Sequence, residues 1–257
     1  MARMRSKRHR QEREERVFKE HRKTDQGIFD TKTMISLSKF YNKGIIAALK
    51  SPIARGKEAD IYLAEAGDSE ILDGNKYVAM KFFRLDATAF IKMAKYIKGD
   101  PRFERQVGRG RDSVIKTWCK KEFGNLRVAA DAGVHAPKPY MFNGNIIAME
   151  FLGDKETIAP TLNDVRLNGP ELILEIIIED IKRLFKRRLV HADISEYNIL
   201  VYNGIPYMID FGQAVSIRHP SAPEFLKRDV TNLLRYFNRV YKIKKDQAEV
   251  YNYITAP

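Results

Sequence analysis

The sequence predicts an α+β protein of two lobes, a small β-rich N-terminal lobe and a short, mostly helical C-terminal lobe. Strand-like runs at 59–66, 77–83, 139–142 and 145–149 precede residue 151, and after it only 199–202 and 205–209 are strand-like. One helical segment, from about Ser113 to Ala132, interrupts them. Beyond Pro170 the apolar residues recur mostly at helical spacing. We place the lobes at residues 31–152 and 153–257, behind a charged arm at 1–30.

The most informative stretch is a predicted hairpin near residue 200. Residues 199–202 and 205–209 are strand-like, and Asn203-Gly204 between them is the strongest two-residue hairpin signal. Pairing across this turn puts 202 opposite 205, 200 opposite 207 and 198 opposite 209. Asn198 and Asp210 should therefore reach one open end, with Asp193 in the loop just before. The alternative is an ordinary hairpin with polar ends.

This arrangement resembles the catalytic loop and metal-binding Asp of the protein kinases, His-x-Asp-x-x-x-x-Asn followed by Asp-Phe-Gly. Two oxygen ligands beside one carboxylate suit a hydrated Mg²⁺ and a base for a hydroxyl proton. We expect Asp193 to accept or orient the proton of the nucleophile. We expect Asn198 and Asp210 to hold Mg²⁺ across the phosphates of ATP.

The first lobe begins with apolar residues at helical spacing in 31–50, with Gly44 near the end. A turn at Arg55-Gly56-Lys57-Glu58 then lies where a kinase-like fold keeps its phosphate loop. It has one glycine instead of three, so by itself it is a weak signal for nucleotide binding. We nevertheless expect its backbone N–H groups to contact phosphate.

The run Tyr77–Phe83 predicts a strand with two different faces. Alternation puts Ala79 and Lys81 on one face, where the small Ala79 leaves room for a flat ring. Lys81 resembles the lysine of the kinase Val-Ala-Ile-Lys strand and can reach the α- and β-phosphates. A surface lysine at a strand end is the alternative.

The helix over 113–132 has Ser113 as its expected N-cap and Gly133 just past its end. Trp118, Glu122 and Leu126 fall on one stripe at i, i+4 spacing. A carboxylate on an apolar stripe needs a cationic partner, and Lys81 is the candidate. Otherwise Glu122 lies at the edge of the stripe and stays hydrated.

The chain between the lobes is expected to bind the adenine edge. Asn143-Gly144 is predicted to join the strands at 139–142 and 145–149, and Met149–Gly153 then resembles the kinase hinge. The backbones of Glu150 and Leu152 are the candidates, because alternation makes them face the same way. We add Leu200, on the first hairpin strand, to the nucleotide-binding residues.

The second lobe is predicted to be built on two helical regions. Pro170 begins a helix that is apolar nearly all round, as expected for a central buried helix. Residues 222–254 also have helical spacing, with a core face at Leu226, Val230, Leu233, Leu234, Phe237, Val240 and Tyr241.

Composition excludes several classes of protein. The 257 residues are 44% hydrophobic and 31% charged, no apolar run reaches membrane-spanning length, and the basic N-terminus lacks the apolar segment of a secretory signal. The single cysteine, Cys119, excludes an internal disulfide or a Cys-rich metal site. We expect a cytoplasmic protein with no membrane partner.

The chain carries a net charge of +13, and residues 1–25 hold ten Lys/Arg and five Asp/Glu. A basic arm of this kind binds phosphate backbones through counterion release, but a solvated tail explains it equally well. A second basic stretch, residues 102–111, has no helical or strand period, and we expect a mobile loop. Whether this loop orders over a nucleotide stays open.

Taken together, the motifs resemble the RIO family of atypical serine/threonine protein kinases over roughly residues 30–250. They are Gly56–Tyr62, Lys81, Lys121–Leu126, Leu189–Asn198, Ile209–Gln213, His219-Pro220 and Glu224–Leu226. The charged segment of about 30 residues ahead of the first helix is too short for the winged-helix domain of a type-two member, so we expect type one.

The resemblance implies a bilobal protein-kinase-like fold that uses ATP and Mg²⁺, with Mn²⁺ as a possible substitute. It implies phosphoryl transfer to Ser/Thr, mostly as autophosphorylation, together with ATP hydrolysis. It also implies work on small ribosomal subunit maturation, with pre-ribosomal particles or rRNA as partners. In this family the Asp at the position of Asp210 can carry a phosphoryl group as an intermediate.

Departures from ordinary protein kinases narrow the expected activity. His191-Ala192-Asp193 lacks the Arg that holds a phosphorylated activation loop, so that switch should be absent. Ala222-Pro223-Glu224 lies only 12 positions after Asp210, too soon to close a normal activation segment, and we treat it as coincidence. Only 47 residues follow Asp210, too few for the helical platform that grips peptides. An ATPase-like or highly restricted kinase is therefore favoured.

Two other functions remain open at this level. A small-molecule kinase of the aminoglycoside-phosphotransferase type shares the Asp-x-x-x-x-Asn loop, but usually has a larger second lobe with an acidic pocket. A ribosome or RNA assembly factor that uses nucleotide only as a conformational switch would explain the basic arm and the missing peptide platform.

Overall fold

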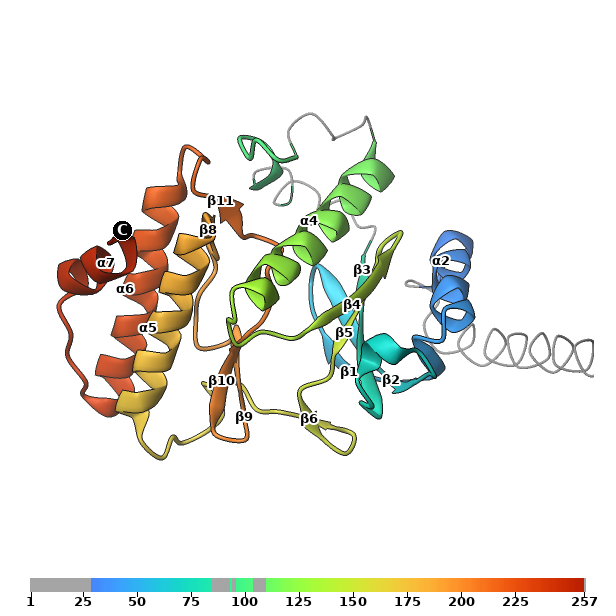
Figure 1. Ribbon diagram of the computed structural model, residues 1–257, viewed down its shortest axis with the longest axis horizontal. Helices are drawn as coiled ribbons and strands as arrows, with labels where there is room; N and C mark the ends of the chain where they lie inside the picture. Colours follow the sequence, from blue (N-terminus) through green and yellow to red (C-terminus); the bar gives the residue numbers. More distant parts are fainter. Residues whose placement is uncertain (1–28, 85–92, 94–95, 104–109, 257) are drawn as a thin grey trace, which may run out of the picture. The chain divides into compact units, whose positions relative to one another are not determined.

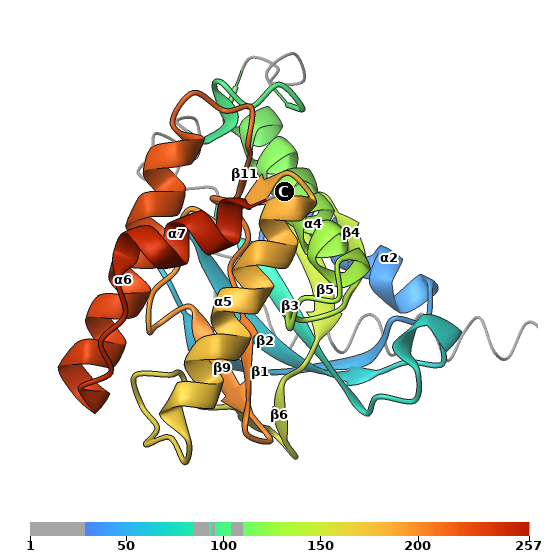
Figure 2. The same cartoon turned by 60° about the vertical axis from the view of Figure 1, so that its left-hand side comes forward.

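The computed structural model describes residues 29–84, 93, 96–103 and 110–256. The basic arm at 1–25 and most of the basic stretch at 102–111 lie outside the described residues. The chain divides into two compact units, shown in Figures 1 and 2. The first unit holds the chain up to Asp86 together with Tyr140–Glu150, and the second holds Ala87–Pro139 and Phe151–Pro257.

The first unit is built on a five-stranded sheet with the strand order β1-β2-β3-β5-β4. Its strands are β1 (Ile46–Arg55), β2 (Ala59–Ala66), β3 (Tyr77–Phe83), β4 (Pro139–Asn143) and β5 (Ile146–Glu150). The bounds of β2 and β3 are those predicted from the sequence. A short 3-10 helix, η1 (Glu70–Leu72), lies between β2 and β3.

The predicted helix over 31–50 is wrong in its second half. Helix α2 (Thr31–Asn42) begins where Asp30 Oδ1 accepts a hydrogen bond from the Thr33 N–H at 2.7 Å. It ends before Gly44, which has a left-handed φ of 67°. The chain then forms β1, paired antiparallel with β2 through an irregular register. Ala-Ala-Leu-Lys at 47–50 has good helix propensity, and only pairing with β2 overrides it.

Asn145 ties the turn between β4 and β5 to its neighbours. Its amide nitrogen donates to the Phe83 carbonyl at 3.0 Å and to the Thr33 hydroxyl at 3.1 Å. The turn lies one residue later than predicted, because Asn143 is still in β4. The apolar core of the unit includes the edge-to-face rings of Phe29, Tyr62 and Phe82.

The second unit contains the helices α4 (Arg111–Asp131), α5 (Pro170–Lys186), α6 (Ala222–Tyr241) and α7 (Gln247–Thr255). Helices α5, α6 and α7 pack on one another, as Figure 2 shows. Two-stranded sheets join β6 (Gly153–Asp154) to β7 (Thr157–Ile158), β8 (Leu189–Val190) to β11 (Val215–Ser216), and β9 (Ile199–Tyr202) to β10 (Ile205–Met208).

Helix α4 begins two residues earlier than expected, after Gly110, so Ser113 is not its N-cap. Its end is as predicted, because Gly133 adopts a left-handed φ of 67° and its N–H bonds the Ala130 carbonyl at 3.0 Å. This helix, which the sequence analysis placed in the first lobe, falls in the second unit.

Helix α5 begins at Pro170 as predicted, but it is not buried all round. One face packs Ile173, Leu174, Ile177, Ile178, Ile181 and Leu184 inward, whereas Leu172 is 65% exposed. The predicted core face of α6 is confirmed at Leu226, Val230, Leu233, Leu234 and Phe237, while Val240 and Tyr241 are half-buried. In the part of the chain that the structure describes, no helix is long and apolar enough to cross a membrane.

Candidate active site

The hairpin of β9 and β10 has the predicted register. Tyr202 pairs with Ile205, and Leu200 with Tyr207. Asn203 and Gly204 have φ of 52° and 76°, the left-handed pair that this tight turn requires. At the open end the Ile209 N–H donates to the Asn198 carbonyl at 3.0 Å. The hairpin therefore carries Asn198 and the residue before Asp210 to one place.

The Asp193 carboxylate is held at this open end. Asn198 Nδ2 donates to the Asp193 carbonyl at 2.9 Å and to its Oδ2 at 3.0 Å. Gln213 Nε2 donates to the same Oδ2 at 2.8 Å. Because the nitrogen of Asn198 faces Asp193, its amide oxygen is directed elsewhere, and oxygen is the atom that Mg²⁺ binds.

Two residues of the site hold strained backbone. Ala192 and Asp210 have φ of 64° and 63°, a region that side chains other than glycine rarely enter. Each such residue costs on the order of 1–3 kcal/mol and persists only where its surroundings enforce it. Ala192 lies beside Asp193, and Asp210 lies at the open end of the hairpin. Backbone strain of this kind is concentrated in functional sites.

Asp229 of α6 enforces the conformation of the loop. It is fully buried and accepts hydrogen bonds from the Ala192 N–H at 2.7 Å and the Ile194 N–H at 3.1 Å. Arg228 donates to the Ala192 carbonyl from the same helix. Burial raises the pKa of Asp229 to about 7, although the two N–H donors oppose this. Sequence reasoning missed Asp229. Its signal was one acid on the apolar stripe of a predicted helix.

His191 supports the other side of the hairpin. Its ring is buried against Phe211 with the ring centroids 4.6 Å apart. Burial lowers the pKa of His191 to about 4, even though Asp210 favours its charged form. The imidazole is therefore neutral at pH 7, and Nε2–H donates to the Ile209 carbonyl at 3.1 Å. This fixes the residue just before Asp210.

Buried polar groups of α4 fix the segment that follows Asp210. Lys121 Nζ donates to the Gly212 carbonyl at 2.7 Å and to the Ala214 carbonyl at 2.6 Å. Asn125 Nδ2 donates to the Phe211 carbonyl at 2.9 Å and to the Ala214 carbonyl at 3.0 Å. Burial lowers the pKa of Lys121 to about 7, against the attraction of Asp100.

A second layer supports these α4 side chains. Arg102 forms an ion pair with the buried Asp100 at 2.7 Å and donates to Asn125 Oδ1 at 2.9 Å. Burial by itself would raise the pKa of Asp100, but hydrogen bonding and attraction from Arg102 lower it overall. The residue types of this network were visible in the sequence. Nothing in their spacing indicated that they would meet.

The predicted site residues of the first unit lie on β1, β3 and β5 and in the turn between β1 and β2. Arg55, Gly56 and Lys57 are exposed, with the Gly56 N–H closing the turn on the Ala59 carbonyl at 3.0 Å. The Glu58 side chain is half-buried, and its carbonyl accepts the Arg84 N–H at 2.9 Å.

On β3, Lys81 is 7% and Ala79 is 6% exposed, so Lys81 is not the surface lysine of the alternative. Glu122 of α4 is only 1% exposed, which excludes a hydrated carboxylate at the edge of the stripe. Trp118 and Leu126 are buried on the same stripe as predicted. Lys81 and Glu122 belong to different units, and their pairing stays a prediction.

The predicted adenine-binding residues are divided between the units. Glu150 ends β5, where it pairs with Val78. Leu152 and Leu200 pack together with Ala159 in one small apolar cluster, and the Leu152 carbonyl accepts the Ala159 N–H at 2.9 Å. The sequence did not indicate that Leu152 and Leu200 would be neighbours.

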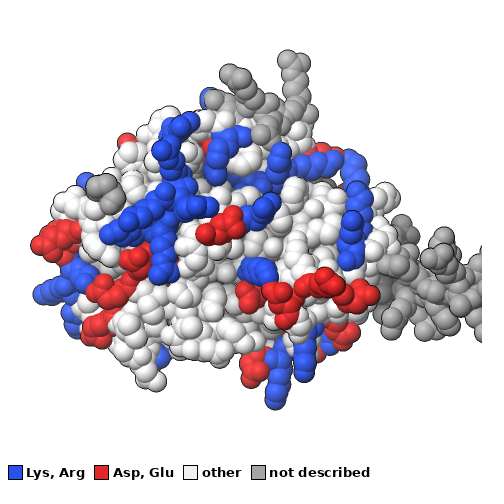
Figure 3. Space-filling view, viewed as in Figure 1, with Lys and Arg blue, Asp and Glu red and all other residues white. Residues whose placement is uncertain are grey.

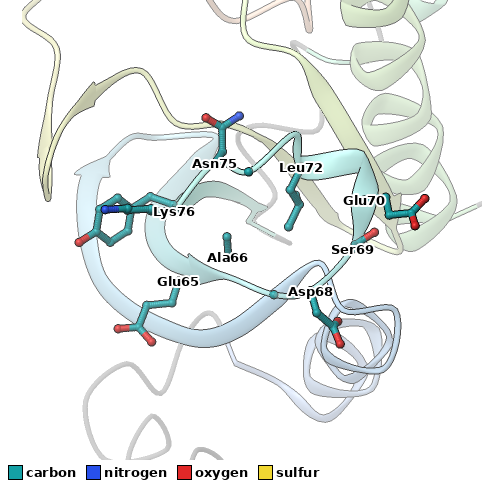
Figure 4. Close-up of a pocket in the computed structure, with 11 residues that line it drawn as sticks. Glu65, Ala66, Asp68, Ser69, Glu70, Leu72, Asn75 and Lys76 are labelled. Atoms are coloured by element: carbon teal, nitrogen blue, oxygen red, sulfur yellow. The ribbon is translucent and has the colours of Figure 1, made fainter.

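A cavity of about 600 Å³ lies elsewhere in the first unit, between the end of β2 and the start of β3. Figure 4 shows Ala66 and Leu72 pointing into it and the carboxylates of Glu65, Asp68 and Glu70 pointing away. None of the predicted site residues lines this cavity. We do not assign the nucleotide site to it.

The fold and the loop–hairpin geometry together define a protein-kinase-like enzyme. A model of the RIO domain matches residues 60–250. The chain is 38% identical over 233 residues to the RIO-type serine/threonine-protein kinase Rio1 of Haloferax volcanii, covering 91% of this chain and 78% of that protein. It is 36% identical to the Rio1 kinase of Methanocaldococcus jannaschii, covering 94% and 80%. The chain belongs to the RIO family and is a protein kinase, with type-one relatives as expected.

Solved structures of the Rio2 kinase from Chaetomium thermophilum share the fold. One superposes with a TM-score of 0.68 at 23% identity, covering 87% of this chain and 66% of that chain. Another, a complex of that kinase with ADP/Mg²⁺ and phosphoaspartate, gives a TM-score of 0.64 at 20% identity, covering 88% and 67%. These likenesses confirm the predicted kinase-like α+β architecture.

Proposed function

We propose that this kinase binds ATP with Mg²⁺ and transfers the γ-phosphoryl group to a Ser or Thr hydroxyl, in the first place on itself. Water serves as a second acceptor, which makes the protein an ATPase. The observation that carries the proposal is the Asp193 carboxylate, held by Asn198 and Gln213 at the open end of a hairpin that leads into Asp210.

Asp193 takes the role of the base. Its carboxylate accepts or orients the proton of the attacking hydroxyl, and two amide donors hold it in place for this role. Asp229 keeps the loop in the one backbone conformation that presents it, by binding the N–H groups on either side of Asp193.

Asn198 and Asp210 fit the hard cation that the reaction needs. An amide oxygen and a carboxylate are ligands that Mg²⁺ accepts, and Mg²⁺ usually takes only one or two protein ligands beside phosphates and water. Among the described residues no group of three or more His, Cys, Asp or Glu forms a closed metal site. When bound, Mg²⁺ or Mn²⁺ would neutralise charge on the phosphates.

The residues that we propose for the nucleotide belong to both units. Lys81, held by Glu122, would neutralise the α- and β-phosphates, and the backbone of Arg55–Glu58 would contact phosphate. Ala79 and Leu200 would cover the faces of the adenine, and the backbones of Glu150 and Leu152 would bind its edge. The burial of Ala79, Lys81, Glu122, Leu152 and Leu200 supports these roles.

Asp210 is also the candidate for a covalent intermediate. The Rio2 kinase of Chaetomium thermophilum has been solved as a complex with ADP/Mg²⁺ and phosphoaspartate. In this chain Asp210 is the acid that a strained, left-handed backbone holds at the hairpin end. We infer that its carboxylate can carry the phosphoryl group before water or a hydroxyl accepts it.

We further propose that the kinase acts in the cytoplasm on precursors of the small ribosomal subunit, with rRNA as a partner. The net charge of +13 supports a polyanionic partner. Basic and acidic side chains are interspersed on the face shown in Figure 3, so the charge of the described residues alone does not locate the contact.

A nucleotide switch with little catalysis is the second candidate, because α6 and α7 are the only helices that the structure describes after Asp210, and they form no larger platform for a peptide.

The test uses ATP labelled in the γ-phosphate. Label on the protein supports the kinase, and release of labelled phosphate supports the ATPase. Asp193→Asn should reduce turnover by roughly 10²-fold or more while ATP still binds. Asp164→Asn, at an exposed acid that bonds only its neighbours Thr161 and Asn163 in the described structure, is the matched control.

Three outcomes would contradict parts of the proposal. Substantial hydrolysis by Asp193→Asn would remove its role as the base. Label transferred to a small hydroxyl compound would favour the aminoglycoside-type phosphotransferase. ATP binding without any turnover, even with pre-ribosomal particles, would favour the switch.

A further inference from the structure

Gln213, the first residue after Asp210-Phe211-Gly212, is one of the two amide donors to the Asp193 carboxylate. Its side chain is half-buried and its Nε2 lies 2.8 Å from Asp193 Oδ2. An ionised carboxylate has hydrogen-bond acceptors but no donor, so the nitrogen of the Gln213 amide faces it. Gln213 therefore links the metal-binding segment directly to the proposed base.

The backbone on either side of Gln213 is rigid. The Gly212 and Ala214 carbonyls both accept hydrogen bonds from the buried Lys121 Nζ. A Cβ on Gly212 would lie 2.7 Å from the Trp118 ring, so the chain passes this point without spare room. The Gln213 amide is thus presented from a fixed position and not from a mobile loop.

Two donors on one oxygen restrict the Asp193 carboxylate. Asn198 approaches Oδ2 from within the loop and Gln213 approaches it from the segment after Asp210. Together they oppose rotation of the carboxylate about its terminal bond. Without Gln213, one of the two restraints is lost.

We propose that Gln213 is a positioning residue for the reaction, which holds the Asp193 carboxylate in its reactive orientation when the Asp210 segment is in place. This rests on the proposed function of Asp193 as the base. The Gln213 amide is not among the residues that we propose for nucleotide binding. Its loss should therefore lower the rate of phosphoryl transfer and leave the affinity for ATP unchanged.

The test compares Gln213→Leu with the wild-type full chain, using Mg²⁺-ATP turnover and the affinity for a fluorescent ATP analogue. A hydrogen bond to a charged group is worth roughly a ten-fold change in rate or more. We expect kcat to fall about ten-fold, with KM for ATP and analogue affinity within about two-fold. Gln247→Leu is the matched control, because it removes an amide hydrogen bond of 2.8 Å to Thr231 between α6 and α7.

The split between kcat and KM separates positioning from mere packing, because a general loss of packing would also weaken the binding of ATP.

Gln213→Glu keeps the shape and serves where Gln213→Leu fails to fold. It places a second carboxylate against Asp193, so at a pH of about 8 its kcat should fall further than that of Gln213→Leu. Wild-type kcat in either folded variant, or a rise in KM for ATP as large as the fall in kcat, would overturn the role of Gln213. Absence of turnover in the wild type would instead overturn the proposed function, and the two failures are therefore distinct.

Discussion

Lys121 gives the sharpest prediction about stability. Its side chain is fully buried, and burial lowers its pKa from 10.5 to about 7. Between these two values the unfolded chain carries a proton on Lys121 that the folded chain has lost. Unfolding therefore takes up a proton, and the free energy of unfolding rises as the pH rises from 7 towards 10.5.

The size of the effect follows from the shift. Proton linkage with a folded pKa of about 7 gives a gain of about 2 kcal/mol between pH 7 and pH 9. The other residues with large pKa shifts in the described structure titrate at the lower edge of the range from pH 7 to pH 9 or outside it. His191 and Asp229 change charge in the folded state at about 4 and about 7, and Tyr140 and Tyr236 titrate at about 12.

The assay is urea unfolding at about pH 7 and about pH 9, for the wild type and Lys121→Met. The variant should lose the pH-dependent gain, because Met carries no proton. At the higher pH it should also be less stable by about 2 kcal/mol, since the Gly212 and Ala214 carbonyls lose a buried donor. Lys120→Met, at the exposed neighbour on α4, is the control and should keep the wild-type slope.

A wild-type free energy of unfolding that is flat across this pH range would refute the reasoning. So would an equal slope in Lys121→Met. Either result would mean that the ammonium group stays charged in the folded protein, with its hydrogen bonds to the two carbonyls compensating fully for its burial.

Three other substitutions test the site. Gly212→Ala places a methyl group 2.7 Å from the Trp118 ring, so overpacking should lower the free energy of unfolding by about 1–3 kcal/mol, measured as a lower melting temperature. Gly124→Ala is the control, because the space around Gly124 is open, and it should raise the stability slightly. Asp229→Asn replaces an acceptor of two N–H bonds by a group with one acceptor atom, so kcat should fall with little change in KM for ATP, and wild-type kcat would contradict the anchoring role. Asp210→Ala should weaken Mg²⁺-dependent binding of ATP in titration calorimetry, and affinity equal to wild type would remove it from the metal site.

Local patterns were reliable where few residues decide the backbone. The hairpin register was predicted from Asn203-Gly204, because a two-residue turn with positive φ leaves only one pairing of its strands. The stop of α4 at Gly133 follows from the same conformational freedom. By contrast, residues 46–50 were equally compatible with a helix, and their pairing with β2 decided the outcome.

The burial of polar side chains was predicted only in part. Glu122 was expected in an apolar stripe, and its burial is confirmed. The stripe by itself does not indicate which group binds the Glu122 carboxylate. Asp229 sits on a similar stripe of α6 and was overlooked, although an acid at such a position always requires donors. For α5 the apolar pattern overstated burial, because Leu172 remains exposed.

By itself the sequence determined the spacing of Asp193, Asn198 and Asp210, the tight turn of the hairpin beside them, and membership of the RIO family. Only the tertiary structure decided which distant groups support these residues. Lys121 meets carbonyls about 90 residues away in the chain, and Asp229 meets N–H groups about 35 residues back. Desolvation requires each buried polar group to find a partner, but spacing along the chain does not say which one.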